Sequence, residues 1–255
     1  MPNKSCWIAG SVLVILLCQP WRAGAATQSA DAHERFARQP IAFEVLHRKG
    51  DCPVHVARGP GYHVAIEAGT AALTMFRRAR GNAADASGPI QAEQVAIRFL
   101  EAQPGTCPEA TAPPIAVHHH YISRDPVHWR TQVPLHREVV QRSIYPGVDV
   151  IWYGRQRDLE FDLVLQPGAD PTLIRIAIRE ALAVSLAPDG ALDIQVAGGR
   201  VRQHVPRAYQ EIGGRRVAVE AGYVLEKQPT GQVVTLRLRR GELDLKRSVV
   251  SGGGC

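Results

Sequence analysis

Three carboxylates stand at alternate positions in one strand-like stretch of the chain. Asp158, Glu160 and Asp162 lie two residues apart within the run RDLEFDLVLQ. In a β-strand they would share one face, at a spacing of roughly 6 to 7 Å. Glycoside hydrolases use two carboxyl groups about 5 to 9 Å apart. With the nearby Trp152 and Tyr153, these three acids form the candidate ligand face of the chain.

The same spacing also predicts an ordinary half-buried strand. Leu159, Phe161 and Leu163 alternate with the acids, so the apolar side chains would face the core and the acids would face solvent. The acids would then pair across strands with cations such as Arg155, Arg157, Arg175 and Arg179. We favour this interpretation. A calcium site built from the acid oxygens is a further alternative, although the dense Asp/Asn/Gly loop of such sites is missing.

A run of three histidines is the second candidate for chemistry. His118 and His120 would share one face of a strand, and His128 or His136 would supply a third ligand. Zinc and copper sites use three imidazoles in this way. A histidine-rich surface strand with incidental metal affinity is the simpler interpretation. We therefore expect no functional metal, and the candidate ligands are His118, His120 and His128.

Other catalytic signatures are missing from the sequence. There is no Gly-x-Ser-x-Gly elbow and no glycine-rich strand–loop–helix for a nucleotide. The aromatic residues Trp129, Tyr145, Trp152 and Tyr153 would form a sugar-stacking platform if exposed, but aromatic residues in strands more commonly belong to the core. We expect no enzymatic activity and no cofactor.

The elements that must position these residues are short strands. Apolar and polar residues alternate from residue 41 onward, and turn signals recur every 8 to 12 residues, as at Gly59-Pro60-Gly61 and Pro188-Asp189-Gly190. This pattern is typical of an all-β fold, an antiparallel sandwich or open barrel. The Pro-rich loop at 103–114 suggests a division into two packed β lobes, over 40–114 and 115–250.

The N-terminus has the features of a secretory signal. Lys4 is followed by an apolar run too short for a membrane span and by an Ala-x-Ala site at Ala23 and Ala25. We expect a signal peptide over 1–26, a polar leader over 27–39 and a flexible tail over 251–255. The mature chain, without a transmembrane span, would be exported to the periplasm or the cell surface.

The cysteines fit an exported protein, and the distribution of charge bears on nucleic-acid binding. Cys52 and Cys107 remain after removal of the signal and would pair in an oxidising compartment. Cys255 would be left as an odd thiol. The formal charge of +6 is spread along the chain, so we expect no specific binding of nucleic acid.

Several segments resemble one family. They are ARGPGYHVAI, IYPGVDVIWYGRQRDLEFDLVLQPGADPTLIRI, GGRVRQHVPRAYQEIGGRRVAVEAGYVL and a D-P-x-x-W-x-T-x-V-P core formed by Asp125, Pro126, Trp129, Thr131, Val133 and Pro134. The chain resembles the uncharacterised N-terminal domain of bacterial cell-surface proteins that carry SBBP-type β-propeller repeats. The resemblance implies export, a β-rich fold and attachment to larger surface proteins. It implies no reaction and no catalytic residue.

Two departures from the family pattern stand out. The family opens on an F-E-x-N-x-G-Q type of stretch, whereas this chain has FEVLHRKGDCP. Relatives continue into propeller or adhesive modules, so a chain ending at Cys255 would be a stand-alone or a truncated version. The first hypothesis is a non-enzymatic structural or interaction module of the bacterial envelope, with an unknown envelope protein or glycan as its partner. The alternatives are a glycan-binding or glycoside hydrolase-like protein using the acidic face, and a metal-binding protein using the histidine run.

Overall fold

The computed structural model describes residues 41–46, 52–78, 89–155, 158–212, 215–228, 231–238 and 249–254. The expected signal peptide and leader lie outside these residues, as does Cys255. In the described part of the chain, the regular elements are β-strands and two short 3-10 helices, and all named strand pairs are antiparallel. The all-β prediction is therefore confirmed. No helix in these residues is long and apolar enough to cross a bilayer.

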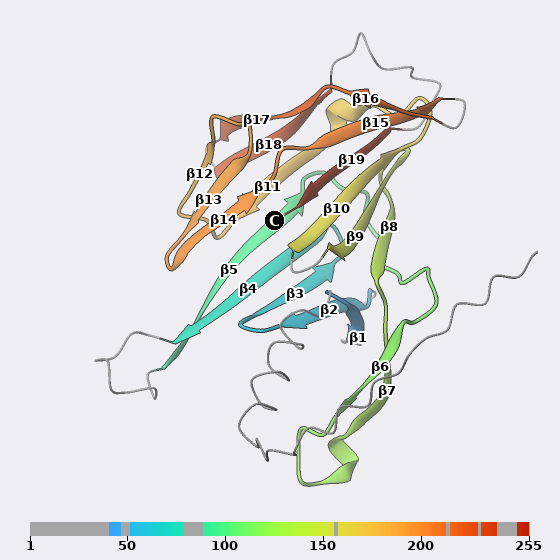
Figure 1. Ribbon diagram of the computed structural model, residues 1–255, viewed down its shortest axis with the longest axis vertical. Coiled ribbons are helices and arrows are strands. Elements are labelled where there is room, and N and C mark those ends of the chain that lie inside the picture. Colours follow the sequence, from blue (N-terminus) through green and yellow to red (C-terminus); the bar gives the residue numbers. More distant parts are fainter. Residues whose placement is uncertain are drawn as a thin grey trace, which may run out of the picture.

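The largest sheet has eight strands and combines both halves of the chain (Figure 1). Its order is β1 (Phe43–Leu46), β2 (Val54–Gly59), β3 (Tyr62–Glu67), β4 (Thr70–Arg78), β5 (Ile90–Phe99), β11 (Arg175–Arg179), β18 (Gly231–Leu238) and β17 (Ala221–Gln228). Glycines at positive φ close its first hairpins, with Gly61 at 81° and Gly69 at 66°. The sheet does not follow the division expected near residue 114, because β11 pairs directly with β5.

The second large sheet has six strands and holds the acidic stretch. Its order is β16 (Arg215–Val219), β15 (Arg207–Ile212), β19 (Val249–Gly254), β10 (Asp158–Leu165), β9 (Val148–Arg155) and β8 (Glu138–Tyr145). The structure places residues 251–254, for which we expected a flexible tail, in β19. Their backbone pairs with β10 on one side and β15 on the other, and a strand needs no side chain to make these bonds.

The two large sheets share one hydrophobic core. Phe99 of β5 lies edge-on to Tyr145, Trp152 and Phe161 of the six-stranded sheet, with ring centroids 6.3, 6.1 and 6.3 Å apart. A three-stranded sheet, β12 (Ala183–Leu186), β13 (Leu192–Val196) and β14 (Gly199–Gln203), adds Ile194 and other side chains to the same core. The fold is therefore a sandwich in which segments distant in sequence complete each layer.

A two-stranded sheet projects from the sandwich, as Figure 1 shows. It consists of β6 (Ala116–His120) and β7 (Arg130–Leu135), joined by a turn that contains the 3-10 helix η1 (Pro126–His128). We call residues 115–135 the arm. The second 3-10 helix, η2 (Pro171–Leu173), precedes β11.

A disulfide joins the two parts of the chain that flank β2–β5. Cys52 lies just before β2, and Cys107 lies in the loop between β5 and β6. The predicted pairing of these cysteines is therefore present in the structure, with Cα atoms 5.1 Å apart.

Candidate functional site

The acids of β10 lie on the outer face of the six-stranded sheet. Asp158 is exposed and Glu160 and Asp162 are half-buried, while Leu159, Phe161 and Leu163 between them are buried. This is the alternation that the sequence predicts. The structure thus brings the three acids to one face and places them opposite the core.

Tyr153 is the aromatic residue that belongs to this face. It is the register partner of Glu160, and its hydroxyl donates a hydrogen bond of 3.0 Å to Asp162 Oδ1. Burial, together with the two neighbouring acids, raises the pKa of Tyr153, so the phenol keeps its proton. Burial also raises the pKa of Asp162, and Glu160 adds to this effect.

Trp152 does not belong to the ligand face, and its assignment there was wrong. Its side chain is fully buried, and its indole N–H donates to Gln141 Oε1 over 2.9 Å inside the core. Successive residues of β9 point to opposite sides of the sheet, which separates Trp152 from Tyr153. Tyr145 is likewise buried and Trp129 lies on the arm, so the four aromatic residues form no common platform.

A second group of polar side chains gathers where the arm meets the eight-stranded sheet. The potential ligand atoms of Glu44, His118 and His120 all lie within 4.8 Å of one another. The two histidines come from β6, and Glu44 comes from β1. The carboxylate is buried, with its side chain 2% exposed, whereas His118 opens to solvent. We call these three residues the Glu–His cluster.

Glu44 makes two contacts within its burial site. Its Oε1 accepts a charge-assisted hydrogen bond from Arg58 of β2, and its Oε2 lies 2.6 Å from His120 Nε2. Burying a carboxylate is costly unless it is paired in this way. Arg130 of β7 binds the neighbouring carbonyl oxygen of Val45 over 3.0 Å, which fixes the base of the arm on β1.

The histidines of the cluster favour the neutral form. Burial lowers the pKa of His118, and the neighbouring His120 and Arg58 lower it further. Burial also lowers the pKa of His120, with additional effects from Arg130 and Arg58. Neutral imidazoles are the form that binds metal ions.

The third ligand differs from the one that the sequence predicted. His128 lies exposed in η1 at the far end of the arm, and His136 is engaged with the Ala112 carbonyl oxygen over 3.0 Å. Glu44 takes that place instead. It is separated from His120 by 76 residues, and the alternation of the strand FEVL gives no sign that an acid there is covered by a distant arm.

A cavity of about 310 Å³ adjoins the cluster. Its wall includes Glu44, Arg58, Tyr62, His118, His119 and His120. A ligand bound there would meet imidazoles, a phenol and a guanidinium paired with a buried carboxylate.

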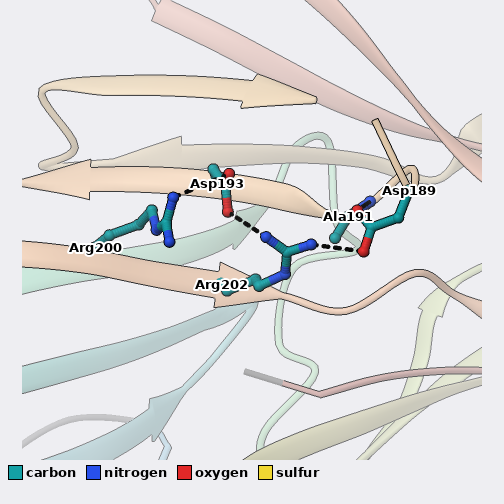
Figure 2. Close-up of polar contacts among 5 residues, drawn as sticks. All are labelled: Asp189, Ala191, Asp193, Arg200 and Arg202. Atoms are coloured by element: carbon teal, nitrogen blue, oxygen red, sulfur yellow. Dashed lines mark hydrogen bonds and ion pairs between the residues drawn. The ribbon is translucent and has the colours of Figure 1, made fainter. Parts of the chain in front are cut away.

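A third polar group, on β13, β14 and the turn before β13, is an ion-pair network. Figure 2 shows Arg202 between Asp189 and Asp193, with contacts of 2.6 and 3.1 Å. Asp189 also accepts from the Ala191 N–H, and this bond and Arg202 lower the pKa of Asp189. These acids are engaged in closing a hairpin, so they do not form a further ligand site.

The comparisons with known proteins identify the family. No curated protein and no solved structure matches this chain at a significant level. One family model, described as a domain of unknown function (DUF7948), matches residues 48–250. The match includes the acidic face, the arm and both cluster histidines, and it begins after Glu44. The chain therefore belongs to the DUF7948 family.

Proposed function

We propose that this chain is an exported, non-enzymatic module that binds another component of the bacterial envelope through its arm. The main support for this proposal is the concentration of exposed apolar side chains on residues 115–129. Six of the twelve exposed large hydrophobic residues in the described part of the chain lie there: Ile115, Val117, Tyr121, Ile122, Val127 and Trp129. Exposed apolar clusters of this kind are typical of binding surfaces.

Internal contacts also fix the conformation of the arm. The Asp125 side chain accepts from the Val127 N–H over 3.0 Å and caps η1, which begins at Pro126. The Trp129 indole N–H donates to the Ser123 carbonyl oxygen, and the Trp129 ring lies edge-on to Tyr121 with centroids 4.9 Å apart. Because the tip is already fixed, a partner loses little binding energy to ordering it.

The chemistry of the arm favours a protein partner. Trp and Tyr anchors beside aliphatic side chains match the composition of protein interfaces. Among the described residues the arm is a separate two-stranded sheet, and an outer edge of such a sheet can pair with a further strand from a partner. The resemblance to domains that precede SBBP-type repeats supports a partner at the cell surface, and attachment to a larger surface protein is part of this proposal.

The acidic face supports a second candidate, a glycan ligand. Tyr153, Glu160 and Asp162 offer an aromatic ring and carboxylate oxygens on one outer face. Because Trp152 is buried in the core, Tyr153 is the one aromatic ring of the candidate ligand face. Stacking on a sugar usually uses a larger aromatic surface. A glycan array with wild type and the double variant Asp158→Asn/Glu160→Gln tests this candidate. Specific glycan binding by wild type that the variant loses would identify the acidic face, and not the arm, as the binding surface.

The arm is tested with matched surface variants. Ile122→Ser/Val127→Ser removes two apolar side chains of the arm that are 74% and 76% exposed. Leu182→Ser/Val217→Ser removes two exposed apolar side chains from the sandwich, 70% and 45% exposed. Envelope extracts of the source organism are passed over each immobilised protein, and bound proteins are quantified by mass spectrometry.

We expect one envelope protein to bind wild type and the Leu182/Val217 variant equally. Its retention should fall at least about tenfold on the Ile122/Val127 variant, which corresponds to about 1.4 kcal/mol. Equal retention on all three proteins would refute the role of the arm. Circular dichroism of each variant checks that the fold is unchanged.

A further inference from the structure

We infer that the Glu–His cluster is a binding site for a divalent transition-metal ion of the zinc type. Two imidazoles and one carboxylate converge within 4.8 Å at the base of the arm. This donor set, with one position left open, is found in zinc sites that retain a water ligand. The inference does not depend on the proposed partner of the arm.

The ligand atoms would have to shift to bind the ion. Zinc–nitrogen and zinc–oxygen bonds of about 2.0 to 2.2 Å place tetrahedral ligand atoms roughly 3.4 Å apart. The contact of 2.6 Å between His120 Nε2 and Glu44 Oε2 is shorter than this, so these two atoms must move apart, and the His118 ligand atom lies within 4.8 Å of both partners. His118 is exposed and lines the adjoining cavity, which leaves its ring room to adjust.

Binding of the ion would move one proton within the His120 ring. The close contact between His120 Nε2 and Glu44 Oε2 is a hydrogen bond, so one proton lies between them. Metal binding at both atoms requires that the imidazole carry its proton on Nδ1 instead. The neutral imidazole can do this by a tautomer change, and no other group has to gain or lose a proton.

Arg58 is compatible with the site because it uses the other carboxylate oxygen. It binds Glu44 Oε1 and leaves Oε2 directed at His120. Ligating carboxylates are commonly held by an outer hydrogen bond of this kind, which fixes their orientation. The positive charge of Arg58 opposes the ion, and the buried negative charge of Glu44 offsets it.

All three residues of the cluster line the cavity of about 310 Å³, so the open position would be reached from it. A water molecule or a small anionic group would complete the coordination from that side. The same ion would join β6 of the arm to β1 of the sandwich, in addition to the Arg130 hydrogen bond to Val45. The site is thus placed to fix the direction in which the arm projects.

The test is isothermal titration calorimetry of the mature, tag-free protein with zinc chloride. The variants are His118→Ala, His120→Ala and Glu44→Gln, and the last keeps a partner for Arg58. His119→Ala and His128→Ala are the matched controls, because both remove an imidazole from the arm outside the cluster. Cobalt chloride provides a second readout, since visible absorption of bound Co²⁺ reports tetrahedral coordination.

We expect one zinc ion per chain. Affinity should fall by more than about 100-fold in His118→Ala and His120→Ala, because loss of an outer partner alone costs 10- to 100-fold. Affinity should be unchanged in both controls. No saturable binding, or equal loss in the control variants, would overturn the inference. If Glu44→Gln fails to fold, the two His→Ala variants and the cobalt spectrum still decide the question.

Zinc should also slow hydrogen exchange in β6 and β7 of wild type and leave it unchanged in His120→Ala. This readout involves no partner protein. A site that binds zinc without protecting β6 would refute the link between the ion and the direction of the arm.

Discussion

At the scale of single residues, the environment decides which polar groups are available for chemistry. Glu160 and Asp162 share a face as their spacing predicts, but Asp162 accepts a hydrogen bond from Tyr153. Glu44 has no local signature and lies buried between Arg58 and His120. The Glu–His cluster and the acidic face therefore differ mainly in burial. The arm, which is distant in sequence, covers Glu44, whereas the acids of β10 lie on an outer face.

Asp162 gives a prediction for the pH dependence of stability. Because burial raises the pKa of Asp162 in the folded state, the folded chain holds that proton more tightly than the unfolded chain. The contribution of this residue to the free energy of unfolding therefore falls as pH rises from the unfolded pKa through the folded one. Asp162→Asn removes the titration and keeps an oxygen for the Tyr153 hydroxyl.

We expect Asp162→Asn to be at least as stable as wild type at pH 7, with a smaller loss of stability between acidic and neutral pH. Urea denaturation across this range measures the difference, with Asp158→Asn at the exposed start of β10 as the control. A variant clearly less stable than wild type at pH 7 would mean that the Asp162 charge is required by the fold.

At the scale of elements, the sequence predicted strands and their faces better than their partners. Alternation in the LEFDLVL run gave the buried and outer sides of β10 correctly, and turn residues such as Gly61 ended hairpins as expected. Local pattern carries no information on long-range pairing, so the contact of β5 with β11 could not be predicted. The Ser-Gly-Gly-Gly segment of β19 lacks the side chains that mark a strand, and its pairing rests on backbone alone.

The same limit explains the candidate site. His118 and His120 were found because strand period places them together, and Glu44 was missed because it comes from another sheet. Trp152 and Tyr153 are adjacent in sequence, yet only one of them reaches the outer face. A sequence pattern shows which residues share a face of a strand, but it does not show which face another part of the chain will cover.

The disulfide gives a prediction at this scale. Cys52 and Cys107 are 55 residues apart, and a link of that span restricts the unfolded chain by about 4 kcal/mol on the chain-entropy estimate. Cys52→Ser/Cys107→Ser should lower the free energy of unfolding by roughly 2 to 5 kcal/mol. Urea denaturation measures the change, with Cys255→Ser as the control. Equal stability of the double variant and wild type would show that the link does not constrain the chain.

At the scale of the whole molecule, the chain combines a sandwich that has one shared core with an arm that carries exposed apolar side chains. The two large sheets share one core, with Phe99 against three aromatic rings of the opposite layer. The arm carries half of the exposed large hydrophobic residues of the described chain, and it is joined to the sandwich next to the Glu–His cluster. A stable core together with an exposed apolar surface is the arrangement that the proposed interaction module requires.

Site-specific photo-crosslinking tests the role of the arm most directly. A benzophenone amino acid is placed at Val127 on the arm in one protein and at Leu182 on the sandwich in another, two positions of similar exposure at 76% and 70%. Each protein is produced in the source organism and irradiated in intact cells. We predict that one envelope protein crosslinks at Val127 and does not crosslink at Leu182. Crosslinking at Leu182 with none at Val127, or the same products at both positions, would contradict the account.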